Sequence, residues 1–555
     1  MTTRLNVIQK PITDPLEPSD RLDCVIVGYY DIDIRQVEAG HRRLKDHSGA
    51  YRNFLSNTAA FRGERHQLMH VLNETIADAT SRRSSLNVAE LPNLGGCYLK
   101  SYLQRRGLNV ALVNFFNSER DALVALLEQS PRAVAITTTF YVDSAPIVDL
   151  VKFVRQYSTE TRIIVGGPFV SNTWANGDPE LQRYTSRVIG ADYYICDSQG
   201  EASLYALLAS LRHKNGEIIR DVPNLIYAPA NGAMERSARI PENNSLDENI
   251  IDWDFFDRQR YVPTVQMRTA RSCAFNCAFC RYPVVAGALT LTSIDRVETE
   301  LRQLHQAGVQ NVVFVDDTFN VPLPRFKELC RMMIRNLFGF SWFSYFRCSN
   351  ADDETFSLMR ESGCRGVFLG IESADAAVLK NMNKHADPSR YRYGIGKLKE
   401  YDILTFASLI VGYPGETEDS VRHTMEFVEQ AAPTFYRAEL YYHDVQTPVQ
   451  QSAAEYRIER AGYSWRHRTM DWQEACDHID AMYRSVRSSI VLPLYMFDFW
   501  SIPYLIGKGI PLETLKQWMG AAQTLILPAP DHDTATLVAA ERQLVSVLRS
   551  GLPRA

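Results

Sequence analysis

Three closely spaced cysteines are the residues of this chain best suited to chemistry. Cys273, Cys277 and Cys280 are separated by three and then two intervening residues. Thiolates are the usual protein ligands of iron–sulfur clusters, and a compact loop can turn all three sulfurs toward one point. Three sulfurs can hold three irons of a four-iron cluster and leave the fourth iron open. The spacing therefore predicts a 4Fe–4S cluster whose open iron can bind a substrate or a second cofactor.

A structural zinc site is the alternative interpretation of these cysteines. Zinc takes four ligands and usually combines one Cys-x2-Cys pair with a second pair. The chain has no second pair, and the next histidine downstream is His305. The spacing thus favours the cluster.

Composition limits the class of protein. With 555 residues the chain is too long for a single core, which predicts two or three domains. It is 45% hydrophobic and 23% charged with a net charge of −5, so nothing points to a nucleic-acid partner or a membrane surface. The other cysteines are scattered without a disulfide framework, which indicates a reducing compartment: Cys24, Cys97, Cys196, Cys330, Cys348, Cys364 and Cys476.

No segment of the sequence has the pattern of a membrane anchor or a secretion signal. The first 20 residues are polar and proline-rich, and we expect them to form an arm. The most apolar late stretch, residues 490–497, is interrupted by Pro493 and is too short to span a bilayer. We therefore expect a cytoplasmic protein.

Residues 21–215 show strands alternating with helices, which is typical of a doubly wound, Rossmann-like parallel sheet. The expected strands are 24–28, 110–115, 133–139, 162–165 and 192–196, and the expected helices are 94–106, 118–128, 144–157 and 201–213. Residues 40–90 are polar and favour helix, without residues that suggest a chemical role.

Ligands of such sheets bind beyond the carboxyl ends of the strands. Small and hydroxyl residues stand at these ends and would let a large flat ligand approach the backbone; tight strand-to-helix turns explain them equally well. The candidate ligand-binding residues are Thr138, Thr139, Gly166, Gly167, Gly200 and Glu201.

A connector, residues 216–261, is expected to contain a hairpin with a turn at 230–232. Residues 262–444 then alternate again, with strands expected at 264–269, 312–315, 343–347, 366–371, 405–411 and 435–442. Six strand–helix units predict a partial (β/α)6 barrel with functional groups at the carboxyl ends of its strands. Residues 445–555 are mixed, mostly helical and rich in aromatic residues, which an ordinary helical core explains better than an aromatic substrate cage.

The Cys-x3-Cys-x2-Cys pattern, with Phe279 before the last cysteine, resembles the signature of the radical S-adenosylmethionine (SAM) enzymes. The sheet upstream resembles the cobalamin-binding domain that precedes many such barrels. The Asp-x-His-x-x-Gly motif, whose histidine supplies a lower cobalt ligand in some cobalamin proteins, is absent. The resemblance implies that cobalamin binds without a histidine from that motif.

The resemblance also implies a SAM site at the strand ends of the barrel. Glu372 could accept the ribose hydroxyls, and Asp316 or its neighbour Asp317 could face the ammonium group of SAM or of the substrate. Gly412 would let the backbone approach the nucleoside, and the backbone of Phe279 would meet the adenine. Each acid could instead cap a helix or lie in a solvated turn.

Several runs resemble one family of these enzymes, the phosphinothricin P-methyltransferases, over about residues 20–515. They are RTARSCAFNCAFCRYPVVAG, FVDDTFNVPLPRF, GVFLGIES, NMNK, ASLIVGYPGET, FWSIPYLIGKG and GAYRNFLSNTAAFRG. The family implies methylation of the phosphinate phosphorus of N-acetyl-demethylphosphinothricin or its peptide in antibiotic biosynthesis. A 5′-deoxyadenosyl radical would take hydrogen from phosphorus, and methylcobalamin would donate the methyl group.

A small dianionic substrate would need guanidinium or imidazole donors. Candidates near strand ends are Arg281, Arg347, Arg437 and His443, although a structural ion pair is the simpler explanation for each arginine. An electron donor such as flavodoxin or ferredoxin is an implied partner. A C-methyltransferase or a radical rearrangement enzyme with the same cofactors is the main alternative, and a cobalamin- or redox-sensing protein is a further one, for which no signalling module is evident.

Overall fold

The computed structural model describes residues 20–31, 34–43, 48–175, 177–213, 221–227, 234–493, 497–526 and 533–553. The predicted arm lies almost wholly outside these residues, as does the predicted turn at 230–232. The chain forms two compact units: Met1–Ile32 with Pro92–Arg260, and Asp33–Leu91 with Tyr261–Ala555. No helix in the described part of the chain is both long and apolar enough to cross a bilayer.

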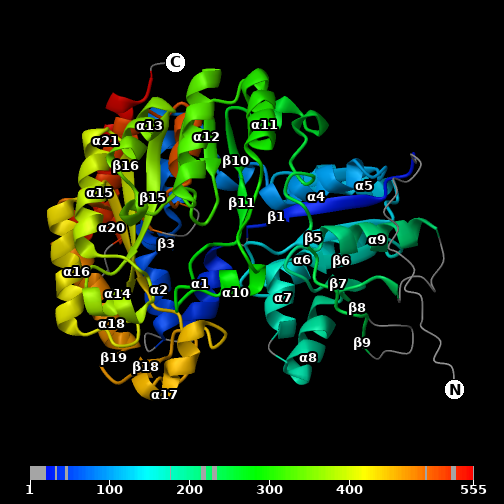
Figure 1. The fold of residues 1–555 in the computed structure, drawn as a ribbon, viewed down its shortest axis with the longest axis horizontal. Helices are drawn as coiled ribbons and strands as arrows, with labels where there is room; N and C mark the ends of the chain where they lie inside the picture. Colours follow the sequence, from blue (N-terminus) through cyan, green and yellow to red (C-terminus); the bar gives the residue numbers. More distant parts are fainter. Residues whose placement is uncertain are drawn as a thin grey trace. The chain divides into compact units, whose positions relative to one another are not determined.

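The first unit is built on a seven-stranded sheet in the order β4-β1-β5-β6-β7-β8-β9 (Figure 1). Its strands are β1 (Cys24–Tyr29), β4 (Val110–Phe115), β5 (Ala133–Thr137), β6 (Arg162–Gly166), β7 (Tyr193–Ile195), β8 (Leu225–Tyr227) and β9 (Glu235–Arg236). The first five are parallel, and β8 and β9 are antiparallel additions from the connector. The chain crosses to one side of β1 and then returns to the other, which confirms the predicted doubly wound sheet and puts its switch point between β1 and β5.

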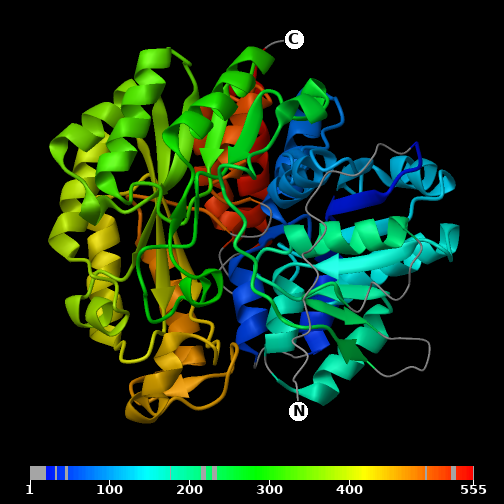
Figure 2. The ribbon, with the colours of Figure 1, turned by 45° about the vertical axis from the view of Figure 1, so that its right-hand side comes forward.

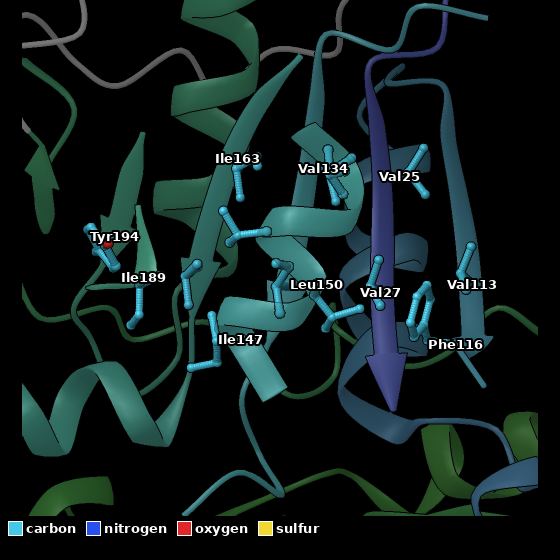
Figure 3. Packing of buried hydrophobic residues seen from close by; sticks show 14 of the residues in the cluster. Val25, Val27, Val113, Phe116, Val134, Ile147, Leu150, Ile163, Ile189 and Tyr194 are labelled. Atoms are coloured by element: carbon cyan, nitrogen blue, oxygen red, sulfur yellow. The ribbon is translucent and has the colours of Figure 1, made fainter. Parts of the chain in front are cut away.

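Strand residues of this sheet are buried on both faces, which explains their nearly continuous apolar runs. Val25 and Val27 face one core, to which α5 contributes Leu123. Helix α6 contributes Leu150 to the same core (Figure 3). Cys24 and Ile26, the alternate residues of β1, face a second core against α4 and α9.

The helices of the first unit are α4 (Leu94–Gln104), α5 (Arg120–Glu128), α6 (Ala145–Tyr157), α7 (Pro168–Ala175), α8 (Pro179–Ile189) and α9 (Glu201–Arg212). Helices α7 and α8 were not anticipated from the sequence. Asp178 caps α8 by accepting hydrogen bonds from its first amides, and Gly190 ends it with a left-handed backbone, φ +71°. These local signals could have identified the helix.

The second unit contains a seven-stranded parallel sheet in the order β10-β13-β14-β15-β16-β17-β20. Its strands are β10 (Thr264–Met267), β13 (Asn311–Phe314), β14 (Ser341–Phe346), β15 (Cys364–Glu372), β16 (Leu404–Val411), β17 (Phe435–Leu440) and β20 (Ile490–Val491). The first six confirm the predicted strands of the partial barrel. The two-residue strand β20 extends the sheet beyond the prediction, because it pairs with the start of β17.

The helices that follow the barrel strands are α10 (Tyr282–Ala286), α11 (Ile294–Ala307), α12 (Leu323–Asn336), α13 (Asp353–Glu361), α14 (Ala376–Asn381), α15 (Pro388–Glu400) and α16 (Glu418–Ala431). Figure 1 shows α15 and α16 along the outer side of strands β15 and β16. The C-terminal helices are α17 (Ala453–Tyr456), α18 (Trp472–Ser485), α19 (Ser501–Gly507), α20 (Leu512–Ile526) and α21 (Thr534–Gly551).

Residues 33–91 pack with this second unit, which differs from the predicted range of 21–215 for the first domain. They form α1 (Ile34–Arg43), α2 (Gly49–Ser56), α3 (Leu68–Thr80) and a hairpin of β2 (Ala59–Phe61) and β3 (Glu64–His66). Helix α3 packs on α21, which pairs with α20 (the red helices of Figure 2), and Trp518 donates to Thr75 at 3.2 Å. The apolar face of α3 does not itself specify which core it joins, so the sequence left this open.

Candidate active site

The cysteine loop is held at its centre from two directions. The amide of Ala278 donates to the Met382 carbonyl at 2.8 Å, and its carbonyl accepts from the amide of Val449 at 2.9 Å. The side-chain amide of Asn383 donates to the Asn276 carbonyl at 3.1 Å. The segments that follow α14 and β17 thus hold the loop at Asn276, which lies between the first two cysteines, and at Ala278, which lies between the second and the third.

The three thiols of the loop are all free. Cys277 is buried, whereas Cys273 and Cys280 are partly exposed. Burial, together with negative charge on Cys277, Asp317 and Cys273, raises the pKa of Cys280 to about 11, so the three sulfurs interact electrostatically. Bound iron would supply the positive charge that three adjacent thiolates require.

The donor set suits a cluster better than a single ion. No three His, Cys, Asp or Glu side chains in the described residues are placed to hold one metal ion. In a cluster each sulfur binds a different iron, so the sulfurs need not converge on one centre. The three cysteines present therefore fit the predicted 4Fe–4S cluster.

Two cations lie beside the cysteine loop. The guanidinium of Arg347 stacks over the Phe275 ring at 3.7 Å and donates to the His385 carbonyl at 3.2 Å. The ammonium of Lys384 lies 5.5 Å from the centre of the Phe279 ring. Burial raises the pKa of Cys277, and these two cations act to lower it. The contacts of Arg347 support the loop, so they do not strengthen its predicted role in substrate binding.

Glu372 lies at the end of β15, as predicted. Its backbone has φ +63°, and its carboxylate accepts from the Lys384 ammonium at 2.8 Å. Gly370 makes room for this pair, since a Cβ there would lie 2.5 Å from Glu372 Oε1 and 3.1 Å from Lys384 Nζ. The carboxylate is therefore held at the barrel rim by a neighbouring cation.

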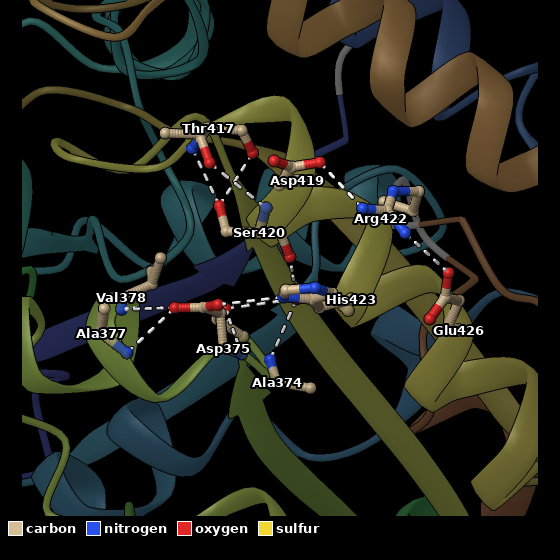
Figure 4. A network of polar contacts seen from close by, with 12 residues as sticks. Ala374, Asp375, Ala377, Val378, Thr417, Asp419, Ser420, Arg422, His423 and Glu426 are labelled. Carbon is tan, nitrogen blue, oxygen red and sulfur yellow. Dashed lines mark hydrogen bonds and ion pairs between the residues drawn. The ribbon is translucent and has the colours of Figure 1, made fainter.

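A polar network joins the turn after Glu372 to helix α16 (Figure 4). Asp375 caps α14 through the amides of Ala377 and Val378, and its other oxygen lies 3.2 Å from His423 Nδ1. The Thr424 hydroxyl accepts from the Ala374 amide at 3.0 Å. This network fixes the turn after Glu372 relative to α16, the helix that follows the glycine turn at 412–416.

Asp316 and Asp317 have different surroundings. Asp316 is buried and accepts from the amides of Thr269 and Ala270, at 2.6 and 2.9 Å, and from the Thr269 hydroxyl at 2.5 Å. It therefore holds the strand that leads into the cysteine loop. Asp317 is exposed, and these contacts favour it over Asp316 as the acid that faces a ligand.

The turn at Gly412 is enclosed by the C-terminal region. Its φ is +91°, and an added Cβ would lie 2.3 Å from Trp465 Cη2. Its amide donates to Glu416 at 2.6 Å, and His467 Nε2 lies 3.2 Å from its carbonyl oxygen. Glycine is thus required by packing, and both backbone groups are already engaged.

Sequence reasoning missed the three residues that hold this turn: Glu416, Trp465 and His467. The rings of Trp465 and His467 stack with an angle of 4°. Burial lowers the pKa of His467 to about 4, so it is a neutral donor, and raises the pKa of Glu416 to about 8. The sequence itself contained one signal of this arrangement, a glutamate that directly follows a turn with two glycines.

The three other predicted substrate-binding residues, besides Arg347, lie in different settings. Arg437 is buried within the barrel on β17, and its Nε lies 2.5 Å from Glu439 Oε1. His443 has both ring nitrogens engaged, by the Tyr441 hydroxyl at 3.1 Å and by Gln450 at 3.0 Å. Arg281 precedes the first turn of α10. By contrast, Nε and Nη1 of Arg437 donate no hydrogen bond to any described residue.

In the first unit, the predicted residues at the ends of β5 and β6 lie together. The Thr138 hydroxyl donates to the Gly166 carbonyl at 2.9 Å and accepts from the Phe169 amide at 3.2 Å. Gly167 has φ +106°, and a Cβ there would lie 2.9 Å from Thr138 Oγ1. Thr139 is exposed beside them. These residues lie together at the carboxyl ends of β5 and β6, next to the switch point.

The remaining predicted residues of this edge differ in role. Gly200 starts α9 with φ +92°. Glu201 is buried and accepts from the side-chain amides of Asn244 at 3.1 Å and Asn249 at 3.0 Å, which ties the connector to α9. Its contacts therefore favour a structural role over contact with cobalamin.

An apolar surface at the switch point went unpredicted. Phe140 and Val142, in the loop after β5, are 60% and 97% exposed, and the Phe140 ring lies 4.9 Å from that of Tyr29 at the end of β1. Apolar side chains beside open backbone suit a large flat ligand such as a corrinoid. No histidine occurs in the strand-end loops at 29–31, 116–119, 138–144 and 196–200, in agreement with the absent motif.

Two family models match consecutive parts of the chain. Residues 88–199 match the B12 binding domain, and residues 267–428 match the radical SAM superfamily. The second match contains the cysteine loop, Glu372 and the Gly412 turn.

An uncharacterized methyltransferase, PH0819, of Pyrococcus horikoshii is 26% identical over 352 residues, which are 61% of this chain and 73% of the relative. The ribosomal protein uS12 methylthiotransferase RimO of Geobacter sulfurreducens is 27% identical over 238 residues, but the match spans only 53% of that protein.

Among solved structures, the radical SAM methyltransferase TsrM from Kitasatospora setae, with cobalamin and a 4Fe–4S cluster bound, has a similar fold. The TM-score is 0.53 at 19% identity, over 65% of this chain and 73% of TsrM. The chain is therefore an α/β enzyme in which a B12-binding domain precedes a radical SAM domain, the combination found in cobalamin-dependent radical SAM methyltransferases.

Proposed function

We propose that the protein methylates the phosphinate phosphorus of N-acetyl-demethylphosphinothricin or its peptide, in the biosynthesis of a phosphinothricin-type antibiotic. The reaction would use a 4Fe–4S cluster, SAM and cobalamin, with electrons from a small donor protein such as flavodoxin or ferredoxin. We place this activity in the cytoplasm, without a nucleic-acid partner.

One observation carries the choice of family. Six of the seven sequence runs that resemble the P-methyltransferases include strand ends or loops of the barrel or the segment that begins at Phe499. They contain the cysteine loop at 268–287, the end of β13, the end of β15 with Glu372, the Lys384 segment and the Gly412 turn, whereas the seventh run, residues 49–63, forms α2 and β2.

The residues of this site have separable tasks. Cys273, Cys277 and Cys280 would hold the cluster, and the cations of Arg347 and Lys384 would offset the charge of the thiolates. Glu372 would hold the ribose of SAM, and the Gly412 turn, whose backbone groups are engaged by Glu416 and His467, would lie beside the nucleoside. Bound together, these cofactors supply a hydrogen-abstracting radical and a methyl donor, while the protein orients them and excludes water.

Methylation of a carbon centre is the second candidate. The barrel interior carries several aromatic side chains, among them Tyr345, Phe368 and Phe406, and such a lining also suits an apolar carbon substrate. A rearrangement with the same cofactors would use the same site.

The deciding assay is turnover by anaerobically reconstituted enzyme with methylcobalamin, SAM, a strong reductant and N-acetyl-demethylphosphinothricin. We expect a new P-methyl signal in the phosphorus NMR spectrum and a matching yield of 5′-deoxyadenosine. Deoxyadenosine without P-methylation would reject the phosphinate substrate and favour a carbon centre.

A further inference from the structure

The interior of the barrel is arranged in layers set by strand register. Tyr345, Phe368 and Phe406 are paired across β14, β15 and β16, and neighbouring rings lie 4.8 and 4.7 Å apart. The next layer toward the carboxyl ends pairs Ser408 with both Gly370 and Arg437. The second layer is formed by Gly370, Ser408 and Arg437, and only Arg437 has a large side chain. The aromatic layer lies below it, farther from the carboxyl ends of the strands.

Arg437 points into this interior. The adjacent residue Tyr436 points the other way, since its hydroxyl donates to the Met482 carbonyl of α18 at 3.1 Å. Alternate residues of a strand face opposite sides of the sheet. The Arg437 guanidinium accordingly lies 5.5 Å from the centre of the Phe406 ring.

The segment that precedes α19 closes the aromatic layer from below. The Phe499 ring lies 6.0 Å from Phe343 and 5.7 Å from Phe406, and the Trp500 ring lies 4.8 Å from Tyr345. Gly366 admits Phe499, because a Cβ on Gly366 would lie 2.9 Å from the Phe499 ring. A ligand in the interior would therefore rest on these rings and face the carboxyl ends of the strands.

Arg437 is only 8% exposed, yet its Nε and Nη1 donate no hydrogen bond to any described residue. Glu439 lies 2.5 Å from Nε, but its Oε1 is likewise without a hydrogen bond, so the pair is close without being aligned. Leaving a buried donor unpaired is costly, so an unpaired buried group in a native structure requires an explanation such as a catalytic role or a bound partner.

The acids near Arg437 do not supply a hydrogen-bond acceptor for its Nη1. Glu439 balances the Nε side. Asp498 is a second acid that interacts with Arg437: burial raises the pKa of Asp498 to about 6, and Arg437 acts to lower it. On the opposite side of the layer, Lys384 is already paired with Glu372. An acceptor oxygen from a ligand would complete the hydrogen bonds of Arg437 Nη1.

We propose that Arg437 binds an oxyanion of the substrate, a phosphinate or carboxylate oxygen, inside the barrel above a floor formed by Phe499 and Trp500. This deepens the proposed function and rests on it for the identity of the substrate. It also separates Arg437 from the other candidates, because Arg347 supports the cysteine loop and His443 has both ring nitrogens engaged.

The test compares wild-type holoenzyme with Arg437→Gln by calorimetry, with N-acetyl-demethylphosphinothricin as the ligand. Loss of a hydrogen bond from a charged donor should weaken binding roughly 10- to 150-fold. SAM affinity and cluster absorbance should stay unchanged. Arg422→Gln is the matched control, since Arg422 is an exposed residue of α16 paired with Asp419 and Glu426, and it should bind like the wild type.

Two further compounds identify the oxyanion. N-acetyl-2-aminobutyrate keeps the carboxylate and lacks the phosphinate, and N-acetylglutamate carries a carboxylate in place of the phosphinate. If Arg437 binds the phosphinate, the substitution should weaken N-acetylglutamate and leave N-acetyl-2-aminobutyrate unaffected. If it binds the carboxylate common to all three, every compound should lose affinity.

The outcomes separate this inference from the proposed function. Equal binding of the phosphinate by wild type and Arg437→Gln would overturn the inference and leave the function standing. Binding of N-acetylglutamate alone, weakened by the substitution, would support the inference and reject the phosphinate. Failure of the wild type to bind any of the compounds would overturn both. Should Arg437→Gln lose its cluster or its circular dichroism, Arg437→Lys serves instead, with a smaller but measurable loss expected because lysine lacks the planar fork.

Discussion

Replacing Gly412 by alanine tests how far the C-terminal region controls the SAM site. The added Cβ would lie 2.3 and 2.5 Å from the Trp465 ring and 2.9 Å from the Cβ of Ala475. None of these atoms belongs to a flexible side-chain end, so the turn must move. Overpacking of this kind costs about 1–3 kcal/mol.

The backbone adds a second cost. Gly412 has φ +91°, a conformation that costs a residue with a Cβ about 1–2 kcal/mol. Together the two effects amount to about 2–5 kcal/mol of strain, which the protein relieves by displacing the turn. If only 1.4 kcal/mol of this strain acts on the bound state, SAM binding weakens about tenfold.

The assay is the SAM dissociation constant of reconstituted enzyme, measured with cluster absorbance as a check on content. Gly396→Ala is the matched control, because Gly396 lies in α15 with nothing within 4 Å of an added Cβ, and it should bind SAM normally. Trp465→Phe in the Gly412→Ala background should recover part of the loss by relieving the contact but not the backbone strain. Unchanged SAM affinity in Gly412→Ala would refute the reasoning.

Three other substitutions address the cluster, a buried acid and the first unit. Cys277→Ala should abolish the broad visible absorbance of the cluster and all SAM cleavage, and retained cleavage would contradict the assignment of this ligand. The pKa of Glu416 is raised by burial from 4.5 to about 8, so the folded state binds more protons than the unfolded state between these values and its stability falls as pH rises across that window. Glu416→Gln should remove this dependence, so the melting temperature of the variant should rise relative to that of the wild type as the pH increases from 5 to 8. A difference in melting temperature that is the same at every pH would disprove the shift. Thr138→Val removes the hydroxyl that joins the Gly166 carbonyl and the Phe169 amide, which should destabilise the first unit by about 1–3 kcal/mol and reduce aquacobalamin retention on gel filtration; full retention would argue against this edge as the corrinoid site.

Local patterns in the sequence were sufficient for the fold class, and the prediction of the cluster ligands rests on a local pattern as well. Buried parallel strands have continuous apolar runs, so β4 was predicted with its observed bounds, Val110–Phe115, and the six main barrel strands were placed within a few residues. The cysteine spacing depends only on neighbours in the chain. The order of elements then determined a doubly wound sheet followed by a parallel barrel.

The tertiary structure decided which residues meet across long separations. Residues 33–91 joined the second unit because the apolar face of α3 is buried by α21, far away in sequence. Contacts with Thr269 show that Asp316 holds the strand that leads into the cysteine loop. Contacts with Asn244 and Asn249 show that Glu201 ties the connector to α9.

The same limit explains what was missed at the active site. Trp465 and His467 enclose Gly412, and Phe499 and Trp500 lie beneath Arg437, yet in each case the partners are more than 50 residues apart. Side-chain type and short-range periodicity determine an element and its buried face. Which faces come together depends on packing among all of the elements, and that packing left Arg437 buried with unpaired donors inside the barrel.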